Sequence, residues 1–208
     1  MTHGDDQGLI LPPKLAPIQA VVIPIYKSDE EKSRVMPVVE QVAQELKDFR
    51  IKVDAREEVT PGFKFNDWEM RGVPLRIEIG PKDVDKGNVA FARRDVPGRA
   101  GKSFAPRTQM AAQVAEMLQT IQASIYERSL AFRKANTFDP VDYGEMCEVV
   151  QKGFSFSWWC GGTECEAKVK EDTKATTRCI PLDQPGGSGP CIVCGEKSTE
   201  KVYWARAY

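Results

Sequence analysis

Four cysteines near the end of the chain have the spacing of a metal site. Cys160 and Cys165 are separated by four residues, Cys191 and Cys194 by two, and 25 residues lie between the two pairs. Four thiolates at such spacings can surround a tetrahedral Zn²⁺ at about 2.3 Å, which leaves no position open for a substrate. The sequence therefore predicts one structural zinc ion bound by these four residues.

The other two cysteines have apolar neighbours. Cys147 follows Met146 and lies close to Val149, and Cys179 lies in the strand-like run TTRCIPL. Both are predicted to be small core residues. Disulfide pairing is the alternative use of the cysteines, but close pairs in a chain without a secretion signal favour metal ligation.

A second group of polar residues alternates with apolar ones between Val73 and Ile79. If the apolar residues share one face of a strand, Arg76 and Glu78 project from the other face, which is expected to be exposed. A basic cluster follows, with a single acid, Asp95, in the interval; its members are Arg93, Arg94, Arg99, Lys102 and Arg107. A solvated hairpin is one interpretation of this cluster, and contact with RNA phosphates is the other.

Apolar periodicity predicts the elements that position these residues. In chain order they are a strand at 19–25, a helix that starts after Ser28, a strand at 51–55, a helix between Pro61 and Gly72, a strand at 73–79, a hairpin at 88–104 and a long helix from Pro106 to about Asn136. This order predicts an α/β fold with a mixed open sheet flanked by helices, followed by a small α+β zinc-binding module. No Gly-x-Gly-x-x-Gly motif follows the first strand, which disfavours a dinucleotide site.

The composition excludes several classes of protein. The 208 residues, 41% hydrophobic and 28% charged, are enough for a globular core with an appendage. The sequence contains no apolar run of about eighteen residues, so neither a membrane span nor a signal peptide is predicted and a cytoplasmic location is expected. A net charge of −1 gives no global attraction to nucleic acid, so RNA binding requires a local basic patch.

The stretch from Gly62 to Asp83 resembles a known family. It reads G-F-K-F-N-D-W-E-M-R-G-V-P-L-R-I-E-I-G-P-K-D. This is similar to the pattern G-W-K-F-N-x-W-E-x-x-G-V-P-x-R-I-E-x-G-P-x-D in the anticodon-binding domain of class II prolyl-tRNA synthetases. The opening run HGDDQGLILPP and the complete four-cysteine pattern extend the resemblance over nearly the whole chain. It points to the archaeal and eukaryotic-like form of that enzyme.

The resemblance implies the C-terminal portion of a proline–tRNA ligase, which uses ATP and Mg²⁺ to attach proline to tRNA-Pro and acts as a homodimer. This portion is expected to bind the anticodon, whose last two bases are guanines, and to be inactive alone because the class II motifs lie upstream. Arginine, lysine and glutamate complement the edges of guanine. The candidate RNA contacts are Arg76, Glu78, Lys82, Arg93, Arg94 and Lys102, to bases or to phosphates. A stand-alone RNA- or protein-binding module is the alternative function.

The resemblance also implies limits for the domains. Residues 1–17 are expected to be a remnant of the catalytic core, 18–136 the anticodon-binding α/β domain, and 137–208 the C-terminal zinc-binding domain. In the first segment no strand is predicted, and the run beginning at His3 is interpreted as a capped loop. At the other end, the α-carboxylate of Tyr208 is expected to reach the active site of the full-length enzyme, as in the family. Packing of Tyr208 on a neighbouring tryptophan is the alternative.

Overall fold

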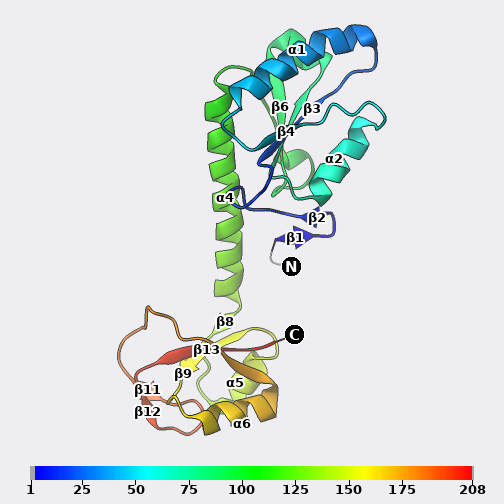
Figure 1. Cartoon of the computed structure of the whole chain (residues 1–208). Helices are drawn as coiled ribbons and strands as arrows, with labels where there is room; N and C mark the ends of the chain where they lie inside the picture. The colour runs from blue at the N-terminus through cyan, green and yellow to red at the C-terminus, as the bar shows by residue number, and fades with distance from the viewer. Residues whose placement is uncertain (1–2, 208) are drawn as a thin grey trace. The chain divides into compact units, whose positions relative to one another are not determined.

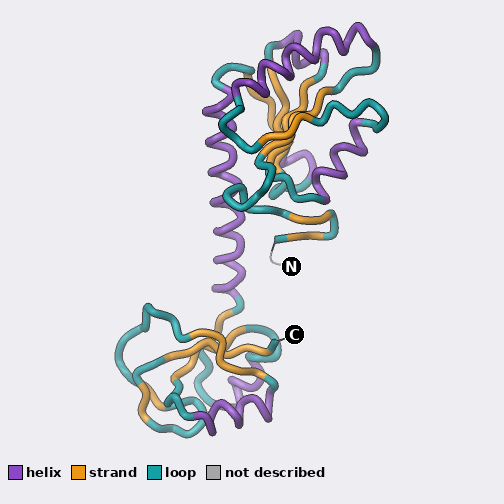
Figure 2. Tube along the Cα trace, in the orientation of Figure 1, coloured by secondary structure: helices purple, strands orange, loops and turns teal. Residues whose placement is uncertain are grey.

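The chain folds into two compact units, Met1–Ser129 and Leu130–Tyr208, in a computed structural model that describes residues 3–207. Each unit combines helices with a sheet of its own (Figures 1 and 2). The long helix α4 (Met110–Ala135) begins in the first unit and ends in the second. Each unit also buries its own hydrophobic cluster, so the two are described in turn.

A five-stranded sheet forms the centre of the first unit, in the order β4-β3-β5-β6-β7. Its strands are β3 (Ala20–Pro24), β4 (Ile51–Val53), β5 (Leu75–Ile79), β6 (Asn88–Arg93) and β7 (Lys102–Pro106). β3 pairs with β4 and β5 in parallel, whereas β5, β6 and β7 pair antiparallel. The predicted open, mixed sheet is confirmed, with a 3-10 turn at Gly98–Gly101 inside the β6–β7 hairpin.

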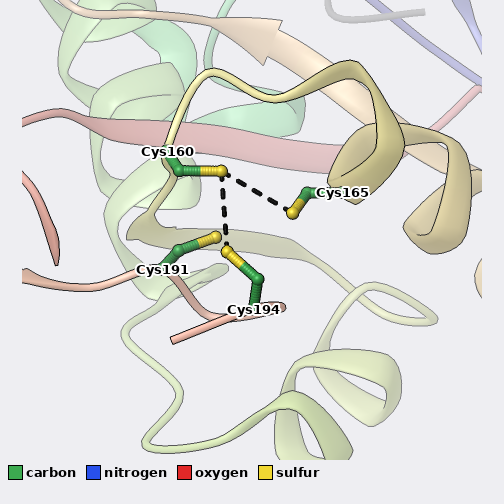
Figure 3. Close-up of side chains that lie close together, drawn as sticks. All are labelled: Cys160, Cys165, Cys191 and Cys194. Carbon is green, nitrogen blue, oxygen red and sulfur yellow. Dashed lines mark hydrogen bonds between the residues drawn. The ribbon is translucent and has the colours of Figure 1, made fainter. Parts of the chain in front are cut away.

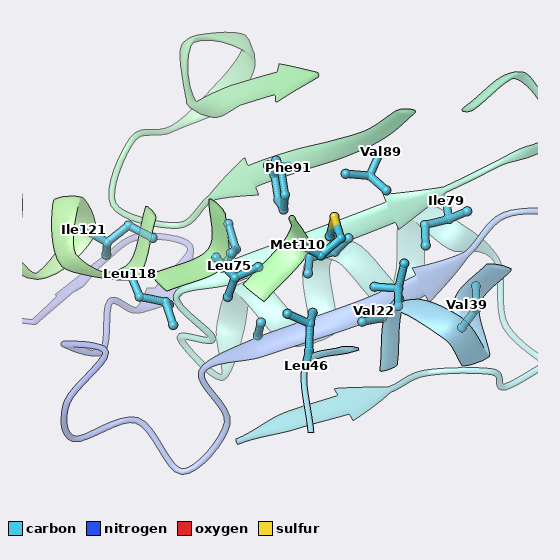
Figure 4. Packing of buried hydrophobic residues seen from close by; sticks show 14 of the residues in the cluster. Val22, Val39, Leu46, Leu75, Ile79, Val89, Phe91, Met110, Leu118 and Ile121 are labelled. Atoms are coloured by element: carbon cyan, nitrogen blue, oxygen red, sulfur yellow. The ribbon is translucent and has the colours of Figure 1, made fainter. Parts of the chain in front are cut away.

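One face of this sheet is covered by α1 (Asp29–Glu45) and α4. Figure 4 shows side chains from both helices packed against the strands; Val39 of α1, Ile121 of α4 and Phe91 of β6 are fully buried. Full burial of one such side chain contributes about 1.5–3 kcal/mol relative to exposure. The apolar residues whose periodicity predicts the long helix therefore form its buried side.

The opposite face is covered over only part of its width. α2 (Pro61–Met70) packs there through Trp68 against Val21 and Ile23 of β3. Beside β3, the register places Arg76 of β5, Ala92 of β6 and Lys102 of β7 in one row across the sheet. Lys102 is exposed, so the hairpin end of this face is open to solvent.

The helices begin where local signals place them, with one correction. Ser28 caps α1 by accepting a hydrogen bond from the backbone N–H of Glu31 at 3.2 Å, as the sequence predicts. The long helix was expected to begin at Pro106, but it begins at Met110. Pro106 instead pairs with Asn88 as the last residue of β7. Proline is tolerated there because β7 is an edge strand.

The first residues contain a hairpin that the sequence analysis missed. β1 (Gly4–Asp5) and β2 (Gly8–Leu9) pair antiparallel, and the backbone N–H of Ile10 donates to the carbonyl of His3 at 2.8 Å. The expectation of a strandless loop is therefore wrong for residues 3–11. Strands of two residues carry almost no periodicity signal, and this pair depends on contacts with distant residues. We call residues 3–11 the N-terminal hairpin.

The second unit contains a four-stranded sheet in the order β10-β13-β9-β8. Its elements are β8 (Thr137–Phe138), α5 (Tyr143–Val149), β9 (Phe154–Trp158), α6 (Thr163–Thr173), β10 (Ala175–Cys179) and β13 (Lys201–Arg206). Met146 of α5 and Val169 of α6 pack with Val202 and Trp204 of β13 in one buried cluster. A second small hairpin joins β11 (Gly189–Pro190) and β12 (Lys197–Ser198). The small α+β module is confirmed.

Among the described residues, no helix combines the length and the apolar character needed to cross a membrane. The expected role of the Tyr208 carboxylate falls on a residue outside the described ones, so it stays a prediction.

Candidate nucleic-acid interface and metal site

Four cysteine thiols of the second unit converge on one point (Figure 3). The distance from Cys160 Sγ is 3.6 Å to Cys165 Sγ and 3.7 Å to Cys194 Sγ, and all four sulfur atoms lie within 4.8 Å of one another. Four sulfur atoms at about 2.3 Å from one zinc ion form a tetrahedron with edges of about 3.8 Å. The thiols are too far apart for disulfides, which need about 2.05 Å, and they fit a tetrahedral metal.

Short turns position these thiols. Cys160 follows β9, Cys165 lies in the first turns of α6, and Cys191 and Cys194 lie in the loop between β11 and β12. In that loop Gly195 has φ 79°, which a residue without a β carbon adopts at no steric cost, and its N–H donates to the carbonyl of Cys191 at 2.9 Å. The spacing of two residues between Cys191 and Cys194 is therefore part of a closed turn.

The protonation of the thiols is set by burial and by backbone donors. Burial raises the pKa of Cys165, because its thiolate is removed from water. At Cys191 burial acts in the same direction, but backbone N–H groups of Val193 and Cys194 outweigh it and lower the pKa to about 7. Cys191 is therefore the thiol of the site that ionises most readily near neutral pH, and the thiolate is the form that binds a metal.

The remaining cysteines are less buried than predicted. Cys147 is half-buried and Cys179 is exposed. Cys179 ends β10, an edge strand whose register shifts between Thr177 and Cys179, so its side chain is not enclosed by a neighbouring strand. The prediction that Cys179 is a core residue is wrong.

Arg76 of β5 lies at the centre of a polar cluster in the first unit. Its Nε donates to Glu78 Oε1 at 3.0 Å, and its Nη1 donates to Glu69 Oε1 at 2.6 Å. The guanidinium also lies over the ring of Phe65, 4.1 Å from the ring centroid. Lys102 Nζ completes the cluster by donating to Glu78 Oε2 at 2.5 Å.

Glu78 does not lie on an exposed face, contrary to the expectation from strand alternation. Glu78 is only 3% exposed, and both of its carboxylate oxygens accept hydrogen bonds from cations. α2 and the side chain of Lys102 cover this part of the face, which a two-residue period cannot reveal. The negative charge of Glu78 therefore neutralises Arg76 and Lys102 inside the protein.

Two adjacent arginines of the basic cluster are also paired. Arg93 binds the buried Asp95 with two hydrogen bonds, at 3.0 and 2.7 Å. Arg94 is 5% exposed and binds Asp5 of the N-terminal hairpin at 2.9 and 2.5 Å, together with the carbonyl oxygens of Glu69 and Gly8. The arginine lowers the pKa of Asp5 to about 2. Arg94 thus joins chain segments to each other.

A cavity of about 330 Å³ lies against this cluster. We call it the β5–β7 cavity, and its lining residues are Gln7, Glu69, Arg76, Ala92, Arg93, Arg94, Val96, Pro97, Gly98, Arg99 and Lys102. Its walls come from the N-terminal hairpin, α2, β5 and the β6–β7 hairpin. Five cations and one carboxylate among the lining residues suit a ligand with both acceptors and donors, such as a nucleotide.

Two family models match the chain. The model of the Anticodon binding domain family matches residues 19–124, and that of the family described as Prolyl-tRNA synthetase, C-terminal matches residues 143–208. The chain belongs to the prolyl-tRNA synthetase family.

Three relatives illustrate the match. The chain is 53% identical to the proline–tRNA ligase of Roseiflexus castenholzii and 52% identical to that of Chloroflexus aurantiacus, over its full length in both cases. It is 45% identical to the chloroplastic/mitochondrial proline–tRNA ligase of Arabidopsis thaliana. The chain spans 44% of the length of the two bacterial relatives and 39% of the plant relative.

For a prolyl-tRNA synthetase domain, the structure brings together four of the six candidate RNA contacts. Arg76, Arg93, Arg94 and Lys102 line the β5–β7 cavity, whereas Glu78 lies beneath it. Lys82 does not line the cavity; it is an exposed residue of α3 (Pro81–Lys86), after the end of β5.

Sequence reasoning missed two residues of the site. Phe65 lies under the guanidinium of Arg76, and Glu69 both pairs with Arg76 and lines the cavity. Both belong to the motif F-N-D-W-E that carries the family resemblance, so a signal was present. Their spacing of four residues on α2 places them on one side of the helix.

Proposed function

We propose that this chain is the tRNA-binding portion of a proline–tRNA ligase and that the β5–β7 cavity holds one base of the anticodon. The observation that carries the proposal is the fixed guanidinium of Arg76, held by Glu69 and Glu78 above Phe65 at the wall of a nucleotide-sized cavity. A side chain held by two carboxylates loses little further entropy when it binds a ligand.

Arg76 and Glu69 together offer a donor and an acceptor that complement guanine. The recorded hydrogen bonds of Arg76 use Nε and Nη1, which leaves Nη2 as its donor to the O6 or N7 acceptors of the base. Glu69 receives Arg76 through Oε1, so its Oε2 is the acceptor for the N1–H or N2–H donors. Glu78 acts behind them by holding Arg76 and Lys102 in place.

The other candidate residues receive different roles in this proposal. Lys102 and Arg93 lie at the cavity wall, where they stay paired with Glu78 and Asp95, and the exposed Lys82 contacts the RNA backbone outside the cavity. Arg94 positions the N-terminal hairpin and does not contact RNA, because its donors are already bound. We assign residues 18–136 to the anticodon-binding domain and 137–208 to the zinc-binding domain.

For the metal site we propose a single structural Zn²⁺ bound by Cys160, Cys165, Cys191 and Cys194. When bound, the ion would link the segment of Cys160 and Cys165 to the segment of Cys191 and Cys194. It would not react with a substrate, since four thiolates fill its coordination sphere. The sulfur separations of 3.6 and 3.7 Å support this assignment.

The activity of the whole protein is also a proposal. By similarity to the relatives, the longer protein attaches proline to tRNA-Pro with ATP and Mg²⁺ in the cytoplasm, as a homodimer. Because this chain spans less than half of those relatives, we expect it to show no proline-dependent ATP–pyrophosphate exchange by itself. Measurable ATP–pyrophosphate exchange by the isolated chain would contradict the proposal that proline activation requires the rest of the longer protein.

The anticodon proposal is tested by binding of the 208-residue chain to tRNA-Pro and to transcripts in which each anticodon base is replaced in turn. Arg76→Ala is expected to lower discrimination at one anticodon position by about 1–3 kcal/mol. The matched control is Arg133→Ala, which removes an exposed arginine of α4. Equal weakening of all transcripts by Arg76→Ala excludes base readout by this residue.

A further inference from the structure

The N-terminal hairpin lies outside residues 19–124, the part that matches the anticodon-binding family, yet it packs tightly on that domain. A β carbon added to Gly8 would lie 2.5 Å from Met70 Cα, and one added to Gly72 would lie 2.6 Å from Leu9 Cβ. The backbone N–H of Leu11 also donates to the carbonyl of Gly72 at 3.2 Å. The hairpin is therefore fixed against the end of α2 by direct backbone contact.

An ion pair fixes the tip of the hairpin as well. Asp5 binds the guanidinium of Arg94 through both carboxylate oxygens, at 2.9 and 2.5 Å, and Arg94 itself is 5% exposed. Asp5 Oδ1 also accepts the backbone N–H of Gln7 at 2.9 Å. This local turn determines where the backbone of Gln7 lies.

Gln7 is consequently held at the β5–β7 cavity. It is exposed and is the one cavity-lining residue contributed by the N-terminal hairpin among the described residues. The primary amide of glutamine offers two hydrogen-bond donors and one acceptor oxygen, with no charge. At the wall of a cavity dominated by cations, such a group distinguishes between base edges, whereas a cation bound to a phosphate attracts every nucleotide alike.

We propose that Gln7 is a specificity-determining residue that contacts the base held in the β5–β7 cavity, so that the N-terminal hairpin forms the second wall of the site. The inference rests on the proposed anticodon-binding function and adds to it an element that the family match does not include. Asp5 and Arg94 are positioning residues in this arrangement, since they act only by holding Gln7.

The experiment uses the 208-residue chain and the set of tRNA-Pro transcripts with each anticodon base replaced. Gln7→Ala removes the amide, and Gln7→Glu keeps its size while replacing the donors with a negative charge. Gln44→Ala and Gln44→Glu are matched controls, because Gln44 is an exposed glutamine of α1. Gln7→Ala is expected to reduce discrimination at one anticodon position by about fivefold, the factor that one net hydrogen bond supports. Gln7→Glu is expected to reduce cognate binding further, and the Gln44 variants are expected to change neither quantity by more than about twofold.

The outcomes separate this inference from the proposed function. If Arg76→Ala lowers discrimination and Gln7→Ala does not, the inference is wrong and the anticodon proposal stands. If neither variant changes discrimination, both are wrong. Equal weakening of all transcripts by Gln7→Ala also overturns the inference, because it indicates a contact with the backbone of the RNA.

Discussion

The metal site takes its four ligands from two short segments of the chain, whereas the β5–β7 cavity takes its lining from the N-terminal hairpin, α2, β5 and the β6–β7 hairpin. In the first case one ion completes the geometry of the whole site. In the second, four of the five cations are held by carboxylates, some of them from distant segments, as Arg94 is by Asp5 and Lys102 is by Glu78. Loss of the ion is therefore expected to disrupt the whole metal site, whereas loss of one ion pair is expected to disrupt only part of the cavity.

This difference predicts a large, all-or-none effect of removing the metal. Structural zinc contributes roughly 10–16 kcal/mol of apparent binding free energy in small modules. A chelator, or Cys160→Ser, is therefore expected to unfold residues beyond about 140 while the first unit stays folded, because the two units have separate cores. Hydrogen exchange followed by mass spectrometry measures both units in one sample. Cys179→Ser is the matched control, since Cys179 is exposed and lies outside the cluster. Unchanged zinc content in Cys160→Ser protein would contradict the assignment of the ligands.

A smaller effect is expected from Glu78, the acid shared by Arg76 and Lys102. Removing one partner of a buried ion pair costs about 3–5 kcal/mol because the other charge stays unpaired. Arg76 keeps Glu69 and Lys102 is 37% exposed, so we expect Glu78→Ala to lower the free energy of unfolding of the first unit by about 3 kcal/mol, at the low end of that range. Urea unfolding measures this change.

The matched control for Glu78 is Glu116→Ala, an exposed glutamate of α4, for which a change within about 0.5 kcal/mol is expected. A cost below about 1 kcal/mol for Glu78→Ala would mean that Arg76 and Lys102 find other partners. In that case the cluster is less fixed than its distances indicate.

The same contrast explains how much of the molecule could be predicted from sequence. The elements of the first sheet and the four thiols follow from short-range signals: the alternation in β5, the cap at Ser28 and the cysteine spacings. Arg94 was expected to contact RNA, but it is paired with Asp5. The sequence could not predict this pair because the two residues are 89 positions apart in the chain. Burial of Glu78 was missed for the same reason, since Lys102 reaches it from β7. Ion pairs between distant segments leave no periodic pattern.

Asp54 gives a pH-dependent test of the first unit. Asp54 is 3% exposed; burial opposes its ionisation, but hydrogen bonds from Arg56 and Trp68 outweigh burial and lower its pKa from 3.8 to about 2. A lowered pKa in the folded state means that ionised Asp54 stabilises the fold above about pH 4, by about 2 kcal/mol. About half of this stabilisation should be lost by pH 3, and the rest as the pH falls through 2.

The measurement is urea unfolding of the first unit at pH 6 and pH 3. Asp54→Asn is expected to cost about 2 kcal/mol at pH 6 and about 1 kcal/mol at pH 3. Asp85→Asn is the control, because that carboxylate is exposed and pairs with Arg34 at the surface. An Asp54→Asn cost that is the same at both pH values would show that hydrogen bonding rather than charge determines its contribution.

The smallest expected effect concerns the salt dependence of RNA binding. Five cations line the β5–β7 cavity, but four of them pair with carboxylates, and Arg99 is the one without an ion pair among residues 3–207. Each phosphate neutralised on single-stranded nucleic acid contributes about −0.7 to the slope of log K against log salt concentration. Arg99 and the exposed Lys82 are the two phosphate contacts proposed, so binding of an isolated anticodon stem–loop is expected to show a slope of about −1.4. Arg99→Ala is expected to bring it closer to zero by about 0.7 and Arg133→Ala to leave it unchanged. A slope near −3.5 would mean that the internal ion pairs open and all five cations bind phosphates, in which case the cavity is assembled by the RNA and is not fixed beforehand.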